Sequence, residues 1–256
     1  MRLAVLGCNG FVGRNLIRHL NYLGLDPTPL SRPFRYETAD YNIIINTAGY
    51  KDIIGCEKNI NRAIDDNVRL LFQLSQAPGK IIHISTDYVF NDSQTPKNEN
   101  TVPNPNTTYG ITKLAGEILL GKAKKDHLII RTGGLYDKDH WLMTDCMIKI
   151  RNNIKVEAFD DVVNTPTYVG SLAKYLIYAM TKNVTGIRHY SDAEALSRYD
   201  LMKTIAKKML LDDSLIIRCK KPAHVNIPTD LSLSSIYDYP RRCVDQSVSA
   251  LLEDAP

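Results

Sequence analysis

The chain has 256 residues, 44% of them hydrophobic and 23% charged, and a formal net charge of +4. This length allows one large domain, or one domain with a smaller appendage. The positive charge lies in small clusters, a pattern that does not indicate nucleic-acid binding but suits a small anionic ligand such as a nucleotide.

Targeting and metal-binding signals are absent from the sequence. The longest apolar runs fall far short of the roughly 20 residues of a membrane span, and no secretory signal opens the chain. The five cysteines are scattered, and none has metal-ligand spacing. We therefore expect a cytoplasmic protein with reduced thiols, no metal site and no membrane or nucleic-acid partner.

The first half of the chain alternates between strand and helix patterns. Apolar, β-branched stretches predict strands at residues 2–7, 27–31, 41–47, 80–84 and 127–132. Stripes of helical period predict helices at residues 11–23, 65–77 and 109–124. This alternation predicts an α/β fold with a Rossmann-like, doubly wound parallel sheet.

The second half has a looser pattern. Helices are expected at residues 141–152, 168–181 and 198–211, and short strands at 154–159, 187–190 and 214–218. We expect a small C-terminal substrate-binding lobe over residues 141–256 that partly returns to the main sheet. It should close over the carboxyl edge of the sheet, where ligands bind in folds of this kind.

A glycine-rich loop follows the first strand. Gly7, Gly10 and Gly13 stand between a predicted strand and a predicted helix. Gly7 permits the tight turn, Gly10 lets the backbone approach a pyrophosphate, and Gly13 lets the helix pack closely against the strand. Residues 1–140 are therefore expected to form a dinucleotide-binding domain.

The end of the second strand predicts which dinucleotide binds. An acid there would bond the ribose 2′-hydroxyl of NADH, whereas a base would accommodate the 2′-phosphate of NADPH. The sequence reads Ser31-Arg32, with Arg35 nearby and no acid before Glu37. This favours NADPH, with NADH as the alternative.

Three further residues form a candidate catalytic group. Thr86 ends a predicted strand, Tyr109 follows 23 positions later, and Lys113 lies one helical turn after Tyr109. The spacing of Gly7, Gly10 and Gly13 resembles that of short-chain dehydrogenases/reductases. By that resemblance, Thr86 would bond the reacting carbonyl and Tyr109 would give it a proton. Lys113 would hold the nicotinamide ribose and lower the pKa of the Tyr109 phenol.

These stretches resemble the dTDP-4-dehydrorhamnose reductase family, the extended short-chain reductases that make activated 6-deoxysugars. The resemblance runs nearly end to end and is most specific in "STDYVF" (residues 85–90) and "YGITKLAGE" (residues 109–117). It implies an NADP-binding domain over residues 1–140 and allows a homodimer. The cofactor residues it implies are Gly7, Asn9, Gly10, Phe11, Val12, Gly13, Ser31, Arg32, Asn46, Thr47, Ala48, Tyr50, Asn67, Ser85, Tyr109, Lys113, Arg131 and Thr132. The substrate residues it implies are Thr86, Asp87, Tyr88 and Tyr109.

The chain departs from this family in several places. The helix expected between the second and third strands is missing, because only about nine residues separate them. The arginine-proline pair expected near the C-terminus is replaced by Ile227-Pro228, which leaves the sugar-diphosphate contact unassigned. Candidates to replace that arginine are Arg218, Lys220, Lys221 and Arg241.

The residue that follows Asp87 distinguishes reduction from dehydration of a nucleotide sugar. Sister dehydratases carry an Asp-Glu pair after the threonine, whereas this chain has Asp87-Tyr88, so dehydration is not expected. The resemblance implies NADPH-dependent reduction of the C4 keto group of a nucleotide-activated 4-keto-6-deoxysugar, with dTDP-4-dehydro-L-rhamnose as the favoured substrate. A nucleotide-sugar epimerase and a non-catalytic subunit similar to methionine adenosyltransferase β remain the alternatives.

Three nearby side chains are expected to have structural roles. His83 lies inside an apolar strand and is expected to be a hydrogen-bonded core residue. Trp141 is expected to serve packing, with base stacking as the alternative. Glu117 lies four residues after Lys113, and we expect a surface pair between them.

Overall fold

A computed structural model describes the whole chain except residues 32–40, 93–94, 125, 223–226 and 254–256. Its strands are β1 (Leu3–Leu6), β2 (Thr28–Leu30), β3 (Ile43–Asn46), β4 (Lys80–Ile84), β5 (His127–Arg131), β6 (Leu135–Tyr136), β7 (Val156–Phe159), β8 (Val163–Asn164), β9 (Thr167–Tyr168), β10 (Gly186–His189), β11 (Leu196–Ser197), β12 (Ile216–Cys219) and β13 (Asp230–Leu231). Its α-helices are α1 (Phe11–Tyr22), α2 (Ile53–Lys58), α3 (Ile60–Ile64), α4 (Leu70–Ser75), α5 (Thr108–Ala123), α6 (Met147–Arg151), α7 (Val169–Thr181), α8 (Arg198–Lys208) and α9 (Val244–Glu253).

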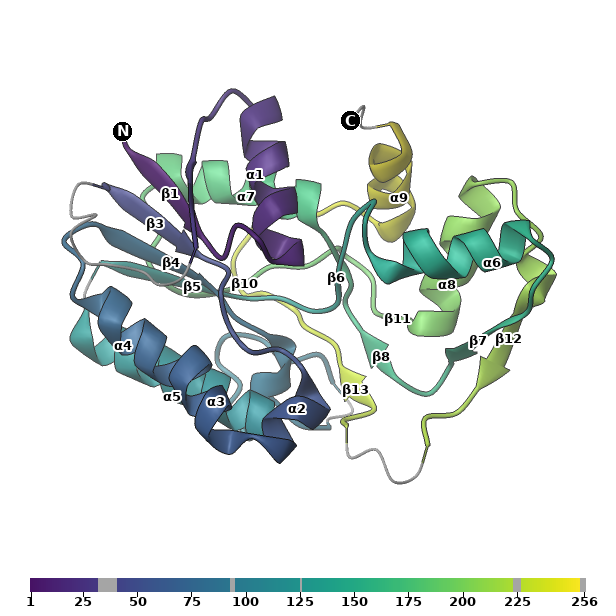
Figure 1. Ribbon diagram of the computed structural model, residues 1–256, viewed down its shortest axis with the longest axis horizontal. Coiled ribbons are helices and arrows are strands. Elements are labelled where there is room, and N and C mark those ends of the chain that lie inside the picture. The colour runs from purple at the N-terminus through teal and green to yellow at the C-terminus, as the bar shows by residue number, and fades with distance from the viewer. Residues whose placement is uncertain (32–40, 93–94, 125, 223–226, 254–256) are drawn as a thin grey trace.

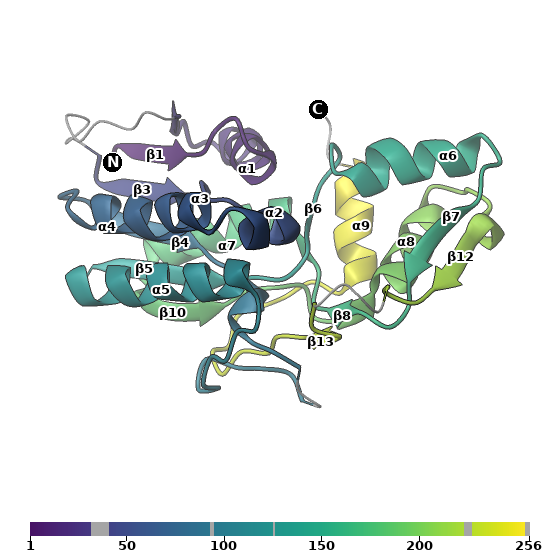
Figure 2. The same ribbon diagram turned by 60° about the horizontal axis from the view of Figure 1, so that its bottom comes forward.

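The main sheet has six strands in the order β10-β5-β4-β3-β1-β2, and every neighbouring pair is parallel. Helices α1 and α7 cover one face, and α2 to α5 lie on the other (Figures 1 and 2). This arrangement confirms the predicted Rossmann-like α/β fold.

Side chains from successive strand positions enter different cores. In β3, Ile43 and Ile45 pack in the layer with α1 and α7, whereas Ile44 packs in the layer with α4 and α5. Because successive side chains of a strand point to opposite faces, a strand covered on both sides is apolar at most of its positions. All four residues of β3 are buried accordingly.

A second lobe follows β6 and contains α6, α8, α9 and the parallel pair β7–β12 (Figure 2). Its own core is formed around Met147, Ile150, Met202, Ile205 and Val248. Segments α7 and β10 return from this half of the chain to the main sheet.

The structure also corrects parts of the predicted element list. Helices α2, α3 and α9 were not predicted. The helix expected at residues 65–77 instead comprises a π-helical turn (Asp65–Arg69) followed by α4. The missing helix after β2 falls on residues 32–40, outside the described residues. Across the described part of the chain, no helix is both long and apolar enough to cross a membrane.

Candidate functional site

The glycine loop joins β1 to α1 where two segments approach closely. Gly7 has a φ of +91°, and a Cβ atom on it would lie 2.8 Å from the backbone nitrogen of Ala48. A Cβ on Gly13 would lie 2.2 Å from the carbonyl oxygen of Gly7. Gly10 is the N-cap of α1 and supplies no side-chain cap, so the first-turn N–H groups of α1 can donate to an anion such as a pyrophosphate. The loop therefore fits the dinucleotide that the sequence predicts.

The ends of the neighbouring strands surround this loop. The Thr47 hydroxyl donates to the carbonyl of Leu6 at 2.8 Å, and the Asn46 side chain accepts from the Ala48 backbone at 3.0 Å. Ser31 is exposed just after β2, while Arg32 lies outside the described residues. Asn67 accepts from the Tyr50 backbone at 2.8 Å and so fixes the chain after β3.

Thr86, Asp87 and Tyr88 lie at the carboxyl end of β4. The Thr86 hydroxyl donates to a carboxylate oxygen of Asp87 at 3.0 Å and accepts from the Tyr88 backbone at 3.2 Å. The other carboxylate oxygen of Asp87 is buried and has no partner among the described residues. Burial raises the pKa of Asp87 to about 7, although the bond from Thr86 opposes this rise.

Tyr109 lies in the first turn of α5, against Tyr88. Their rings meet edge to face, with centroids 5.6 Å apart. The residue is half-buried, and burial of its hydroxyl raises the pKa of the phenol, while a hydrogen bond from Thr86 acts in the opposite direction. Tyr109 is thus protonated at neutral pH, as a proton donor must be.

Lys113 is directed into the protein rather than toward a carboxylate. Its ammonium lies 2.9 Å from the Nε2 atom of His83 and 3.0 Å from the carbonyl oxygen of Ile84. Burial lowers the pKa of Lys113 to about 8. The expected lowering of the Tyr109 pKa by Lys113 is not seen, because burial disfavours the phenolate. His83 is a hydrogen-bonded core residue, as predicted, and its other ring nitrogen lies 3.1 Å from the Asn46 amide nitrogen.

The position of Glu117 differs from the predicted surface pair with Lys113. It is buried and pairs with Arg131 at 2.8 Å instead of forming a surface pair with Lys113. Its other oxygen accepts from the Ser85 hydroxyl. Arg131, predicted to contact the cofactor, therefore directs its guanidinium to α5 in this structure.

A cleft of about 250 Å³ lies between the glycine loop and the end of β4. Its lining includes the predicted residues Phe11, Val12, Ser85, Thr86, Asp87, Tyr88, Tyr109 and Thr132. Sequence reasoning missed Lys51, Ile53, Gly133, Gly134, Leu135 and His140, which also line it. Thus the structure brings Thr86 and Tyr109 to one cleft with the start of α1, whereas Lys113 lies behind it.

A second cavity of about 160 Å³ adjoins this cleft and extends into the second lobe. The cleft and this cavity share four lining residues: Tyr88, Gly134, Leu135 and His140. Trp141 also lines the second cavity and is 41% exposed, so it is not a core residue. Arg198, to which sequence reasoning assigned no role, lines it as well.

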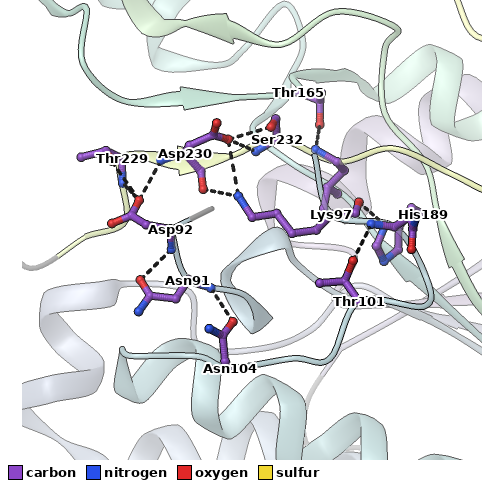
Figure 3. A network of polar contacts seen from close by, with 12 residues as sticks. Asn91, Asp92, Lys97, Thr101, Asn104, Thr165, His189, Thr229, Asp230 and Ser232 are labelled. Atoms are coloured by element: carbon purple, nitrogen blue, oxygen red, sulfur yellow. Dashed lines mark hydrogen bonds and ion pairs between the residues drawn. The ribbon is translucent and has the colours of Figure 1, made fainter. Parts of the chain in front are cut away.

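The loop that leads to Tyr109 is held by a polar network (Figure 3). Asp92 accepts hydrogen bonds from the backbone nitrogens of Thr229 and Asp230, and Lys97 donates to the Asp230 carbonyl. These contacts join residues that are 133 to 138 positions apart in the sequence. They fix the loop over the end of β4 against β13, which limits the freedom of the Tyr109 segment.

The fold and the side chains of this cleft define a Rossmann-fold oxidoreductase. The chain belongs to the family described as the RmlD substrate binding domain, whose model matches residues 1–233.

Three known proteins illustrate the relationship. The spore coat polysaccharide biosynthesis protein SpsK of Bacillus subtilis is 28% identical over 84% of this chain and 82% of its own. A dTDP-4-dehydrorhamnose reductase of Aggregatibacter actinomycetemcomitans is 28% identical over 84% and 83%. The crystal structure of dTDP-4-dehydrorhamnose reductase from Bacillus anthracis in complex with NADP superposes with a TM-score of 0.90, at 22% identity, over 98% of this chain and 97% of that one.

Proposed function

We propose that this protein is an NADPH-dependent reductase of the C4 keto group of a nucleotide-activated 4-keto-6-deoxysugar, with dTDP-4-dehydro-L-rhamnose as the favoured substrate. The observation that carries the proposal is that the Thr86 and Tyr109 side chains line one cleft with the start of α1. The family relationship and the names of the relatives support the same reaction. A cytoplasmic location fits such a biosynthetic enzyme.

The proposed mechanism assigns one task to each side chain. NADPH supplies the hydride when bound, and the uncapped start of α1 would hold its pyrophosphate. Tyr109 protonates the alkoxide that develops at C4, because burial keeps the phenol neutral until that charge appears. Thr86 fixes the substrate oxygen beside Tyr109. Lys113 would turn toward the ribose only by leaving His83 and the Ile84 carbonyl.

The test follows the absorbance of NADPH, and in parallel of NADH, with the dTDP-4-keto sugar. Tyr109→Phe is expected to lower kcat by roughly 10²- to 10⁴-fold, the usual contribution of general acid catalysis. NADPH binding, measured by fluorescence, should be retained. Tyr22→Phe is the matched control, because Tyr22 is 73% exposed at the end of α1.

The alternatives predict different results. Equal turnover by wild type and Tyr109→Phe would show that Tyr109 is not the proton donor. An epimerase would convert the sugar without net consumption of NADPH. NADPH binding without turnover of any keto sugar would instead indicate a non-catalytic regulatory subunit.

A further inference from the structure

Arg198 is a positively charged residue in the cavity that extends from the catalytic cleft. It is the first residue of α8, and its neighbour Ser197 caps this helix by accepting from the Asp200 backbone at 3.1 Å. The guanidinium carbon lies 5.1 Å from the ring centre of Trp141 and 5.4 Å from that of Phe159. Two aromatic rings from different segments thus hold this guanidinium in place.

No carboxylate in the described part of the chain balances this charge. The described residues that line the cavity include no aspartate or glutamate. Among the described residues, Arg198 has cation–π contacts but no ion pair, whereas Arg218 and Lys220 lie 3.5 and 2.8 Å from Asp160. Lys221 in turn donates to the Ile227 carbonyl. Two of the candidates named for the missing arginine are therefore already paired with a carboxylate, and a third is bonded within its own loop.

The surroundings of Arg198 favour an anionic partner. Although the residue as a whole is exposed, burial lowers the pKa of its guanidinium from the ordinary value. A guanidinium that lines a cavity and has no counter-ion among the described residues is available to an anionic ligand. A planar guanidinium fits a phosphate group particularly well, because it can donate two parallel hydrogen bonds.

The position of the cavity indicates which part of a ligand it receives. It shares Tyr88 and His140 with the cleft that contains Tyr109, so one extended molecule can occupy both. The keto sugar would lie at Tyr109, and the groups attached to its anomeric carbon would continue toward α8. In a nucleotide sugar, those groups begin with the diphosphate.

We propose that Arg198 binds the diphosphate of the nucleotide-activated substrate and thereby positions the sugar at Tyr109. This inference rests on the proposed function for the identity of the ligand. Trp141 and Phe159 orient the guanidinium. Arg198 is a binding residue and does not contact the reacting atoms.

The test measures binding of dTDP and of thymidine by isothermal titration calorimetry. Arg198→Gln is expected to weaken dTDP binding roughly 10- to 100-fold, the usual effect of losing charge-assisted hydrogen bonds. Thymidine has no phosphate, so its affinity should not change. Arg198→Lys should recover part of the loss. Arg151→Gln is the matched control, because Arg151 is an exposed arginine at the end of α6 in the same lobe.

Kinetics provide the second measurement. With the dTDP-4-keto sugar, Arg198→Gln should raise KM by a similar factor and leave kcat within about twofold. The reason is that Arg198 would bind the diphosphate equally in the bound substrate and in the transition state. Unchanged dTDP affinity in Arg198→Gln, no dTDP binding by the wild type, or an equal loss for thymidine would overturn the assignment. If dTDP binding depends on Arg198 but no keto sugar is reduced, the inference stands and the proposed reductase activity fails.

Discussion

Asp87 illustrates how a single buried residue can connect catalysis with stability. One of its oxygens accepts from Thr86, which lines the catalytic cleft, and the other has no partner among the described residues. Its pKa of about 7 means that folding favours the protonated carboxyl. The proton on Asp87 therefore affects both the charge next to Thr86 and the free energy of unfolding.

The sign of this effect follows from the two pKa values. Well below pH 3.8 the carboxyl is protonated in both the folded and the unfolded chain, so it has no effect on stability. Between its ordinary value of 3.8 and about 7 the unfolded chain releases this proton while the folded chain retains it, so stability falls as pH rises. Well above pH 7 the carboxyl is ionised in both states, so the free energy of unfolding stays lowered by a constant amount.

We expect Asp87→Asn to remove this pH dependence. The free energy of unfolding of the variant minus that of the wild type should be about 2–3 kcal/mol larger at pH 8 than at pH 5. Urea-induced unfolding at the two pH values measures the difference. Asp192 is also buried with a pKa of about 7, so only the comparison with the variant isolates Asp87. A wild-type–variant difference that does not change with pH would contradict the expectation.

At the scale of elements, a buried ion pair joins α5 to β5. Glu117 on α5 contacts Arg131 on β5 at 2.8 Å, and it also accepts from Ser85 just beyond β4. Both charged side chains are almost fully buried. Because α5 also carries Tyr109 and Lys113, this pair helps to hold the catalytic helix against the sheet.

Removal of one partner should be costly. Glu117→Ala leaves the Arg131 guanidinium buried without its counter-ion, and we expect a loss of about 3–5 kcal/mol in the free energy of unfolding. Asp65→Ala removes an exposed pair with Arg69 and should cost less than about 1 kcal/mol. Urea denaturation followed by circular dichroism compares them. Similar small losses in the two variants would show that the buried pair does not stabilise the fold.

At the scale of the whole molecule, the second lobe is fastened to the main domain through α1. Asp139 accepts from Arg14 and Asn15, and Asp137 contacts Arg18 and lies 2.7 Å from His19. These two acids follow β6, where the chain enters the second lobe. The same helix thus supports the glycine loop at its start and the second lobe along its side.

One outer face of the molecule carries exposed apolar residues. Phe72 on α4 and Ile111 and Ile118 on α5 are 52%, 52% and 55% exposed, and these two helices lie side by side (Figure 2). The homodimer that the family resemblance allows would bury this face, because removal of apolar surface from water lowers the free energy.

Light scattering after size-exclusion chromatography tests the homodimer. The wild type should show twice the 28.9 kDa of one chain, and the double variant Phe72→Lys/Ile118→Lys should show a single chain. Leu210→Lys is the control, because Leu210 is 93% exposed outside this face. A monomeric wild type, or a double variant that remains dimeric, would contradict this contact.

The sequence by itself determined the main sheet, the glycine loop and the order of the candidate catalytic residues. These features depend on local patterns: the buried strands are apolar at most successive positions, and the close approaches at Gly7 and Gly13 admit only glycine. The tertiary structure alone decided that Glu117 pairs with Arg131, that Lys113 contacts His83, and that Arg198 lines the cavity beside Tyr88. Such contacts join segments far apart in the chain. Their partners depend on how helices and strands pack, and no periodicity or spacing within one segment records that packing.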